Sequence, residues 1–271
     1  MGSGMCWCCY LYFTTFGEKI YINQAIKPSK INGDRCLSNA YEYVIEGEIL
    51  PNVRVREDQN SNTGKAMPEF PGYCGPANSE LPIIKVKAVT TRTNPIMQTC
   101  IGPSEEHVSM AGIPTEASIL AMIDKAMPGK CRNVYNASFG GGKYVTIIQF
   151  QKSVPSDEGR QRQAALLAFS AFAELKHVIV VDEDVDIFDI NDVMWAMTTR
   201  FQADLDLITI PGVQCHPLDP SNQPEYHSNI RACGVACKAI FDCTIPFDQK
   251  NRFERAKFMD VDPKHWLPDM V

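Results

Sequence analysis

LKHVIVVDEDVDIFDINDVMWAMTTR, residues 175–200, decides the fold. Its Val178–Val181 run is unbroken and β-branched, which is typical of a strand buried on both faces of a largely parallel sheet. An acidic turn follows, and Asp189 then stands where an N-cap would open a helix. Strand, acidic turn and helix form half of a βαβ unit, so the sequence predicts an α/β domain in this region.

The acidic turn consists of Asp182, Glu183, Asp184 and Asp186. Carboxylates at this place usually cap the next helix and interact with its positive end, contributing about 0.3–1 kcal/mol each. This interpretation is favoured. Asp182 and Asp184 could instead form an Asp-x-Asp pair that binds a metal-bridged nucleotide sugar, as in a metal-dependent glycosyltransferase. A calcium loop starting at Asp182 is excluded, because Ile187 and Val193 stand where such a loop needs Gly and Glu.

Composition indicates a globular protein. The chain has 271 residues, 45% of them hydrophobic and 21% charged, which is enough for one large or two modest domains. With a net charge of -6 and no basic cluster, we expect no nucleic-acid partner. No run of about 18 apolar residues is present, so we expect no membrane span. The eleven Cys lack paired C-x-x-C spacing, which favours reduced thiols in a cytoplasmic protein.

The sequence divides into three regions. Residues 1–16 are atypical and Cys-rich, with no basic residue before Lys19, so they do not predict an export signal. Residues 17–120 favour strands, among them Tyr41–Leu50 and Leu81–Thr91, followed by a helix over Pro114–Met127. Residues 121–271 alternate strands and helices. The elements expected there besides the central strand are Lys143–Phe150, Gln161–Leu175, Leu207–Ile210 and Ala236–Phe241.

Glu69 is a candidate proton donor. It stands between Met67-Pro68 and Phe70-Pro71, a composition unusual for a solvated loop. Apolar neighbours would partly desolvate the carboxyl group and favour its protonated form, which suits general acid catalysis. A Glu that merely caps or pairs is the alternative.

Three other features are weaker. His107 precedes the expected helix, and a single His is more often structural than catalytic. Gly140–Gly142 could approach a phosphate, but a turn into the following strand is favoured. Cys215, His216 and His227 match no tetrahedral metal site, so they stay unassigned.

Five motifs follow one another at Ile45–Leu50, Met67–Tyr73, Ser104–His107, His177–Asp186 and Pro217–Pro220. In this order they resemble the UbiD-type reversible decarboxylases, most closely the hydroxybenzoate, protocatechuate and gallate decarboxylase branch. The resemblance runs from about Gly17 to the C-terminus, and it includes a closing strand and tail at Gly234–Thr244 and Arg252–Lys257.

The resemblance implies a flavin-binding β-barrel, of which residues 17–120 would be a remnant, and a C-terminal α/β domain that mediates homo-oligomer contacts. It also implies prenylated FMN as cofactor, with Mn2+ or another divalent metal and K+, acting on a small aromatic acid. Glu69 matches the family's general acid, Glu57 its upstream partner with Asp58 as the alternative register, and His107 a His that hydrogen-bonds phenolic substrates.

One departure is large. Full-length members carry, upstream of the match, the ligands of the metal and phosphate and an Arg that clamps the substrate carboxylate. The Cys-rich Met5–Tyr12 stands where the last metal-binding Glu would fall. We therefore expect the chain alone neither to bind the flavin tightly nor to decarboxylate, because an acid without an electron sink supplies a minor part of the rate. A non-catalytic, oligomerising remnant of the family is the alternative.

Overall fold

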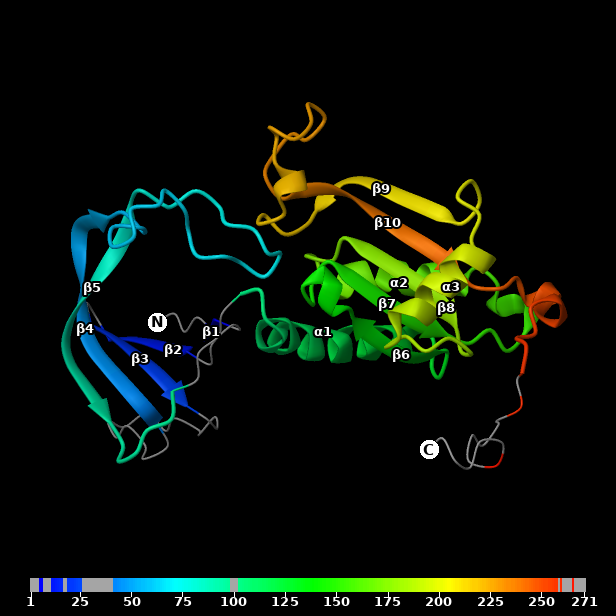
Figure 1. Cartoon of the computed structure of the whole chain (residues 1–271), viewed down its shortest axis with the longest axis horizontal. Coiled ribbons are helices and arrows are strands. Elements are labelled where there is room, and N and C mark those ends of the chain that lie inside the picture. Colours follow the sequence, from blue (N-terminus) through cyan, green and yellow to red (C-terminus); the bar gives the residue numbers. More distant parts are fainter. Residues whose placement is uncertain are drawn as a thin grey trace.

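The computed structural model describes the backbone of residues 5–6, 11–16, 19–25 and 41, and the complete residues 42–97, 102–257, 259 and 265. The side chains of the atypical N-terminus predicted at 1–16 lie outside this part. The described chain contains two five-stranded sheets, one on each side of Figure 1. Helix α1 (Glu105–Ala126) follows the first sheet in the sequence and precedes the second.

The first sheet is an antiparallel meander in the order β1-β2-β3-β4-β5. Its strands are β1 Met5–Cys6, β2 Leu11–Phe16, β3 Lys19–Ala25, β4 Tyr41–Val55 and β5 Leu81–Thr91. The expected strands at Tyr41–Leu50 and Leu81–Thr91 are confirmed, and β4 continues to Val55. Among the described strands this sheet is open, so its closure into a barrel stays a prediction.

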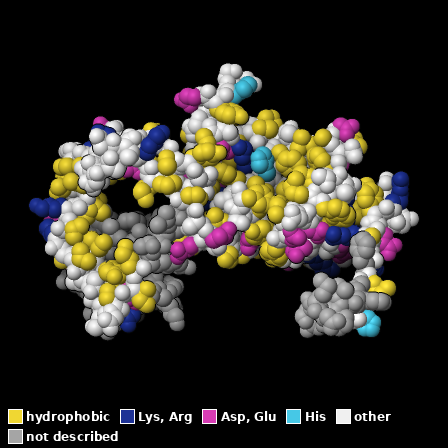
Figure 2. All heavy atoms as spheres, in the orientation of Figure 1, with side chains coloured by type: hydrophobic (Ala, Val, Ile, Leu, Met, Phe, Trp, Pro, Cys, Tyr) yellow, Lys and Arg dark blue, Asp and Glu magenta, His cyan; other side chains and the backbone are white. Residues whose placement is uncertain are grey.

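Much of β5 is uncovered by other described residues. Val86 and Val89 are 51% and 56% exposed, and Ile49 on β4 is 39% exposed. Figure 2 shows such yellow side chains on the half of the molecule that carries this sheet. Apolar residues on a strand normally face a packed layer. The described residues do not supply that layer.

The second sheet has the order β6-β7-β8-β10-β9. Its strands are β6 Cys131–Asn136, β7 Val145–Phe150, β8 His177–Asp182, β9 Leu207–Gln214 and β10 Val235–Cys243. Strands β7, β8 and β10 are parallel, whereas β6 and β9 pair antiparallel at the two edges. The expected largely parallel sheet is therefore mixed. Residues 137–144 between β6 and β7 are too few for a parallel crossover, which takes a dozen or more.

Helices cover both faces of this sheet, as the apolar run in β8 predicts. Val178 and Val180 are fully buried with side chains of α1 and of α2 (Arg160–Ala171). Val181 points to the other face, where it packs with Val193 and Ala196 of α3 (Ile190–Arg200). Burying both faces of one strand gives a three-layer α/β/α domain.

Helix α1 begins earlier than the sequence predicts, and it crosses the expected domain boundary at residue 120 without a break. Ser104 caps it by accepting a hydrogen bond from the His107 amide at 3.3 Å, and Pro114 lies inside it. The burial of Val108 and Gly112 holds the turns before Pro114. Packing thus outweighs the helix-breaking tendency of proline, which the sequence pattern alone had placed at the helix start.

The other differences are small. Helix α2 ends at Ala171, four residues before the expected end, whereas β9 and β10 are longer than expected. Among the described residues, 3₁₀ helices lie at Ser138–Gly140, Pro155–Asp157 and Pro220–Asn222 in connections and at Phe247–Arg252 after the last strand. In the part of the chain that the structure describes, no helix combines the length and apolarity that crossing a bilayer requires.

Candidate active site

The connection between β4 and β5, residues 56–80, reaches from the first sheet to the α/β domain (Figure 1). Backbone hydrogen bonds join its two arms: the Ala66 amide donates to Gly75 at 3.0 Å and the Ala77 amide to Gly64 at 3.0 Å. The connection is therefore an ordered loop with a tip, residues 66–75, and we call it the acid loop because Glu69 lies on that tip.

Glu57 and Asp58 occupy different environments at the base of the acid loop. The Glu57 carboxylate is exposed and accepts a hydrogen bond from the Asn78 amide at 2.9 Å. Asp58 is buried and accepts from the Gly64 amide at 2.6 Å and from Arg56 at 3.0 Å. The Gly64 hydrogen bond, against the effect of burial and together with Arg56, lowers the pKa of Asp58. Asp58 therefore holds the loop's shape, whereas the Glu57 carboxylate faces solvent.

Glu69 lies on a turn at the tip. Its amide donates to the Tyr73 carbonyl at 3.2 Å, and the Gly72 amide donates to the Glu69 carbonyl at 2.9 Å. The Glu69 side chain is exposed, so the desolvation predicted from its apolar neighbours is not found. The reason is that Met67 and Tyr73 are themselves 69% and 63% exposed, while Phe70 turns away into the protein. The backbone is fixed and the carboxylate is free to meet a ligand.

Phe70 sits in a socket of three rings. It is 3% exposed, and its ring centroid lies 5.0 Å from Tyr144, 4.7 Å from His216 and 6.2 Å from His107, all in edge-on orientation. Lys143 places its Nζ 4.7 Å from the same centroid. The α/β domain thus binds the acid loop through aromatic and cation–π contacts.

Gly141 closes the socket. It has φ +66°, and a Cβ added to it would lie 2.5 Å from Cδ2 of Phe70. Next to it Gly142 has φ +68°, and its Cβ would lie 2.5 Å from the Val108 carbonyl oxygen. The glycine turn therefore enters the next strand, as the favoured interpretation holds, and it also admits the Phe70 ring and the first turns of α1.

His107 lies in the first turn of α1, not before the helix as the sequence suggests. It is 8% exposed, and its Nδ1 is buried with no hydrogen-bond partner among the described residues. A Cβ added to Gly102 would lie 3.0 Å from this Nδ1, 3.0 Å from the Pro68 carbonyl oxygen and 3.2 Å from the Glu69 carbonyl carbon. The structure thus brings His107 and the Glu69 backbone together around Gly102.

A glutamate contacts two of the residues that line the socket. Glu174 lies 3.3 Å from Lys143 Nζ and 3.5 Å from His216 Nε2. The Leu218 amide donates to Nδ1 of His216 at 3.1 Å, which leaves Nε2 to carry the proton of the neutral ring. Burial lowers the pKa of His216, although Glu174 opposes the shift. His216, unassigned from sequence, therefore forms part of the wall of the socket, and its burial favours the neutral ring.

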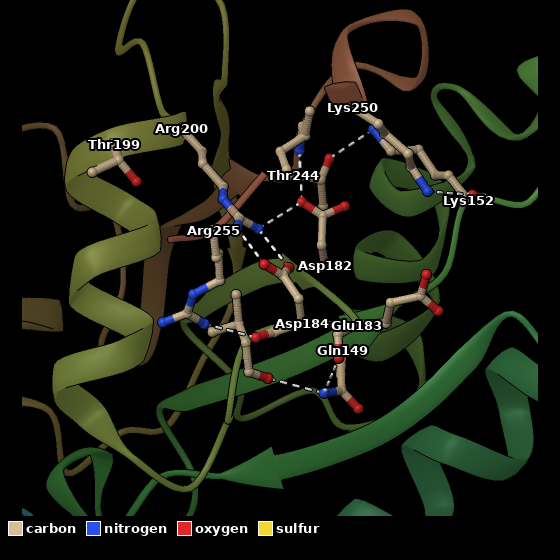
Figure 3. A network of polar contacts seen from close by, with 12 residues as sticks. Gln149, Lys152, Asp182, Glu183, Asp184, Thr199, Arg200, Thr244, Lys250 and Arg255 are labelled. Atoms are coloured by element: carbon tan, nitrogen blue, oxygen red, sulfur yellow. Dashed lines mark hydrogen bonds and ion pairs between the residues drawn. The ribbon is translucent and has the colours of Figure 1, made fainter. Parts of the chain in front are cut away.

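Arg200 binds the acidic turn (Figure 3). Its Nη1 donates to Asp182 at 3.0 Å and to Oδ1 of Asp184 at 2.8 Å, and its Nη2 donates to Oδ2 of Asp184 at 2.6 Å. The Ile245 amide also donates to Asp182 at 2.7 Å. The side chain of Arg200 is 1% exposed, so it is committed to this pair.

These contacts refine the capping interpretation. Asp189 caps α3 through the Asn191 amide at 2.9 Å, as predicted, whereas Asp182 and Asp184 bind Arg200 at the end of that helix. An arginine between the two carboxylates weighs against the glycosyltransferase alternative. In residues 42–97 and 102–257, no three His, Cys, Asp or Glu side chains cluster as metal ligands would.

The sequence did not reveal the socket itself. Phe70, Tyr144 and His216 come from separate segments, and no spacing rule links them. The glycine run before Tyr144 was the available signal, because consecutive glycines often mark a close approach of another chain segment.

Comparisons with known proteins agree on one family. A family profile described as the 3-octaprenyl-4-hydroxybenzoate carboxy-lyase C-terminal domain matches residues 108–243, and the profile of the Rift-related domain of the same carboxy-lyase matches residues 26–105. The gallate decarboxylase of Lactiplantibacillus plantarum is 64% identical over 221 residues, which are 81% of this chain and 45% of the relative.

Solved structures show the same likeness. The apo 3,4-dihydroxybenzoic acid decarboxylase from Enterobacter cloacae is 59% identical with a TM-score of 0.78, and the match covers 86% of this chain and 47% of that one. The UbiD-class enzyme HmfF from Pelotomaculum thermopropionicum, in complex with FMN, is 34% identical with a TM-score of 0.69, covering 92% and 51%. This chain spans about half the length of these relatives. Profiles, relatives and folds together show that the chain belongs to the UbiD family of carboxy-lyases.

Proposed function

We propose that this chain supplies the proton-donating part of a UbiD-type decarboxylase, which catalyses the non-oxidative, reversible decarboxylation of a phenolic acid such as gallate, protocatechuate or a hydroxybenzoate. One observation carries the proposal: Glu69 presents an exposed carboxylate on a loop tip whose next residue, Phe70, is locked into the α/β domain. The 64% identity to a gallate decarboxylase supports the substrate class.

Three side chains have proposed roles. Glu69 delivers a proton to the ring carbon that loses carbon dioxide, which requires an acid within hydrogen-bond reach of that carbon. His107 binds a phenolic hydroxyl of the substrate, since its imidazole lies beside the Glu69 backbone at Gly102. Glu57 is the proposed carboxylate partner of Glu69, because the Asp58 carboxylate is engaged inside the loop.

The cofactor of the proposed enzyme is prenylated FMN with Mn2+ and K+, and the flavin supplies the electron sink. The described residues do not fit this group by themselves, because none of their carboxylates, imidazoles and thiols gather into a set of three metal ligands. In the proposal, residues outside the described part hold the flavin and the metals. Residues 17–120 form the partial barrel, and residues 121–271 form the oligomerising domain.

We also propose a homo-oligomer in the cytoplasm. Apolar side chains are exposed around α3, namely Phe188 at 61%, Ile190 at 42% and Met194 at 44%. Such a patch suits burial against a second copy. The six cysteines whose side chains the structure describes are free thiols, which supports a reducing compartment. Sedimentation that gives a single 30.3 kDa species at micromolar concentration would contradict the oligomer.

The test of the function is complementation. The 271-residue chain is coexpressed with the part of the L. plantarum gallate decarboxylase that it does not match, and it is supplied with prenylated FMN and Mn2+; we call this the assembled enzyme. Carbon dioxide release from gallate is expected from the assembled enzyme and not from the chain alone.

Two substitutions make the test specific. Glu69→Gln should lower the rate by about 10²- to 10⁴-fold, the usual contribution of a general acid. Glu80→Gln is the matched control, because Glu80 is an exposed carboxylate near the end of the same loop and should leave the rate unchanged. Equal rates in the assembled enzyme and its Glu69→Gln variant would refute the proposed function.

A further inference from the structure

We infer that Phe70 is a positioning residue, which fastens the tip of the acid loop to the α/β domain and thereby fixes where the Glu69 carboxylate stands. The inference rests on the proposed role of Glu69 as proton donor and deepens it.

Burial along the tip singles out Phe70. Among residues 66–75 it alone is buried, whereas both its neighbours and the remaining tip residues are exposed or half-buried. A tip with one buried side chain has one apolar attachment. Among the described residues, the backbone hydrogen bonds of the tip stay within residues 64–77, so we ascribe the approach of the Pro68 and Glu69 backbone to Gly102 to that attachment.

The attachment is directional. Edge-on contacts to Tyr144 and His216 and the Lys143 ammonium over the ring fix the plane of the Phe70 ring as well as its depth. Gly141 leaves no room for the ring to shift toward the glycine turn, since its backbone already lies in contact with Cδ2 of Phe70. A fixed ring fixes the adjoining residue, which is Glu69.

The consequence for catalysis is geometric. A proton donor must stand within hydrogen-bond reach of the reacting carbon, and a misplacement of about 1 Å can cost about 10²-fold in rate. Without the Phe70 anchor, the turn that the Glu69 amide closes on Tyr73 would be held only by the two arms of the loop, which the Ala66 amide joins to Gly75, and it could move as a unit. Glu69 would then sample many positions while its chemistry stayed unchanged.

The first experiment measures the anchor without any enzyme activity. In the 271-residue chain, amide hydrogen exchange is followed at Ala66 and Gly72, whose amides are bonded within the loop. Phe70→Ala should accelerate exchange there by about 10- to 100-fold, the factor that corresponds to the burial of one Phe side chain. Exchange in the buried strand β8 should not change. Tyr73→Ala is the matched control, since Tyr73 is an aromatic residue of the same tip that is 63% exposed.

The second experiment separates positioning from general damage. In the assembled enzyme, Phe70→Ala should lower kcat by about 10- to 100-fold with a smaller effect on KM. In a Glu69→Gln background, Phe70→Ala should cause no further loss, because it acts through the carboxylate that is already gone. Phe70→Leu, which keeps most of the buried volume, should recover part of the rate.

The outcomes are distinguishable. Unchanged exchange at Ala66 and Gly72 in Phe70→Ala overturns the inference, and so does an equal loss of kcat in both backgrounds. A rate that Glu69→Gln leaves unchanged overturns the proposed function instead.

Discussion

Gly141→Ala should detach the acid loop from the α/β domain. Gly129→Ala is the control, because it measures the loss of stability that alanine causes through the backbone conformation alone. The two glycines have nearly the same φ, +66° and +70°, both in the left-handed region. Alanine in this left-handed region costs about 1–2 kcal/mol at either site. At Gly129 the new Cβ meets nothing within 4 Å, whereas at Gly141 it would lie 2.5 Å from Phe70.

The additional loss of stability at Gly141 has an upper limit, which is set by the burial of Phe70. The ring can leave its socket and relieve the clash, so the added loss equals at most the free energy of burying Phe70, about 1.5–3 kcal/mol. Gly141→Ala should therefore lower the free energy of unfolding by up to about 2.5–5 kcal/mol in total. Gly129→Ala should lower it by about 1–2 kcal/mol.

Urea unfolding of both variants gives the comparison. Exchange at Gly72 locates the effect, because only Gly141→Ala should accelerate it. Equal unfolding free energies for the two variants, with protection at Gly72 retained, would refute the reasoning.

Further predictions concern buried charges and the socket. Phe70→Ala should raise the pKa of His216, since burial lowers it now; imidazole proton NMR measures this, and an unchanged pKa would contradict it. Burial raises the pKa of Asp157, but Lys130 and the Ser153 and Val154 amides outweigh it and lower the pKa to about 2 from 3.8. The ionised Asp157 should thus stabilise the folded protein by about 2 kcal/mol above pH 4, and this stabilisation should be lost as the pH falls toward 2. An acid titration of the Asp157→Asn variant should not show this loss. Arg200→Ala should destabilise by about 3–5 kcal/mol in urea, because Asp182 stays buried without its cation; a loss under 1 kcal/mol would contradict this.

The α/β core was predictable because its signals are local. The run Val178–Val181 indicated a strand covered on both faces, and α1, α2 and α3 supply that cover. Asp189 as N-cap is equally local. The antiparallel edges escaped prediction because strand order depends on which strands meet in space. The first turns of α1 escaped because tertiary burial of Val108 overrides the signal of Pro114.

The candidate site was likewise predictable in part from the sequence. Motif order pointed to Glu69 and His107, and the structure brings the backbone of one beside the imidazole of the other at Gly102. Composition wrongly suggested that Glu69 is desolvated, because apolar neighbours in sequence need not cover a side chain in space. The Phe70 socket joins residues from four segments, and only the folded chain shows it.

The contact between Phe70 and Gly141 crosses the border between the two regions that the family profiles match separately. For protein engineering, this pair of residues determines whether the loop of one family member is compatible with the α/β domain of another. A chimera that takes the acid loop from one family member and the α/β domain from another should assemble well only when an aromatic residue on the loop meets a residue without a side chain on the domain. Exchanging either half without its counterpart would produce a folded protein whose two parts no longer share one geometry.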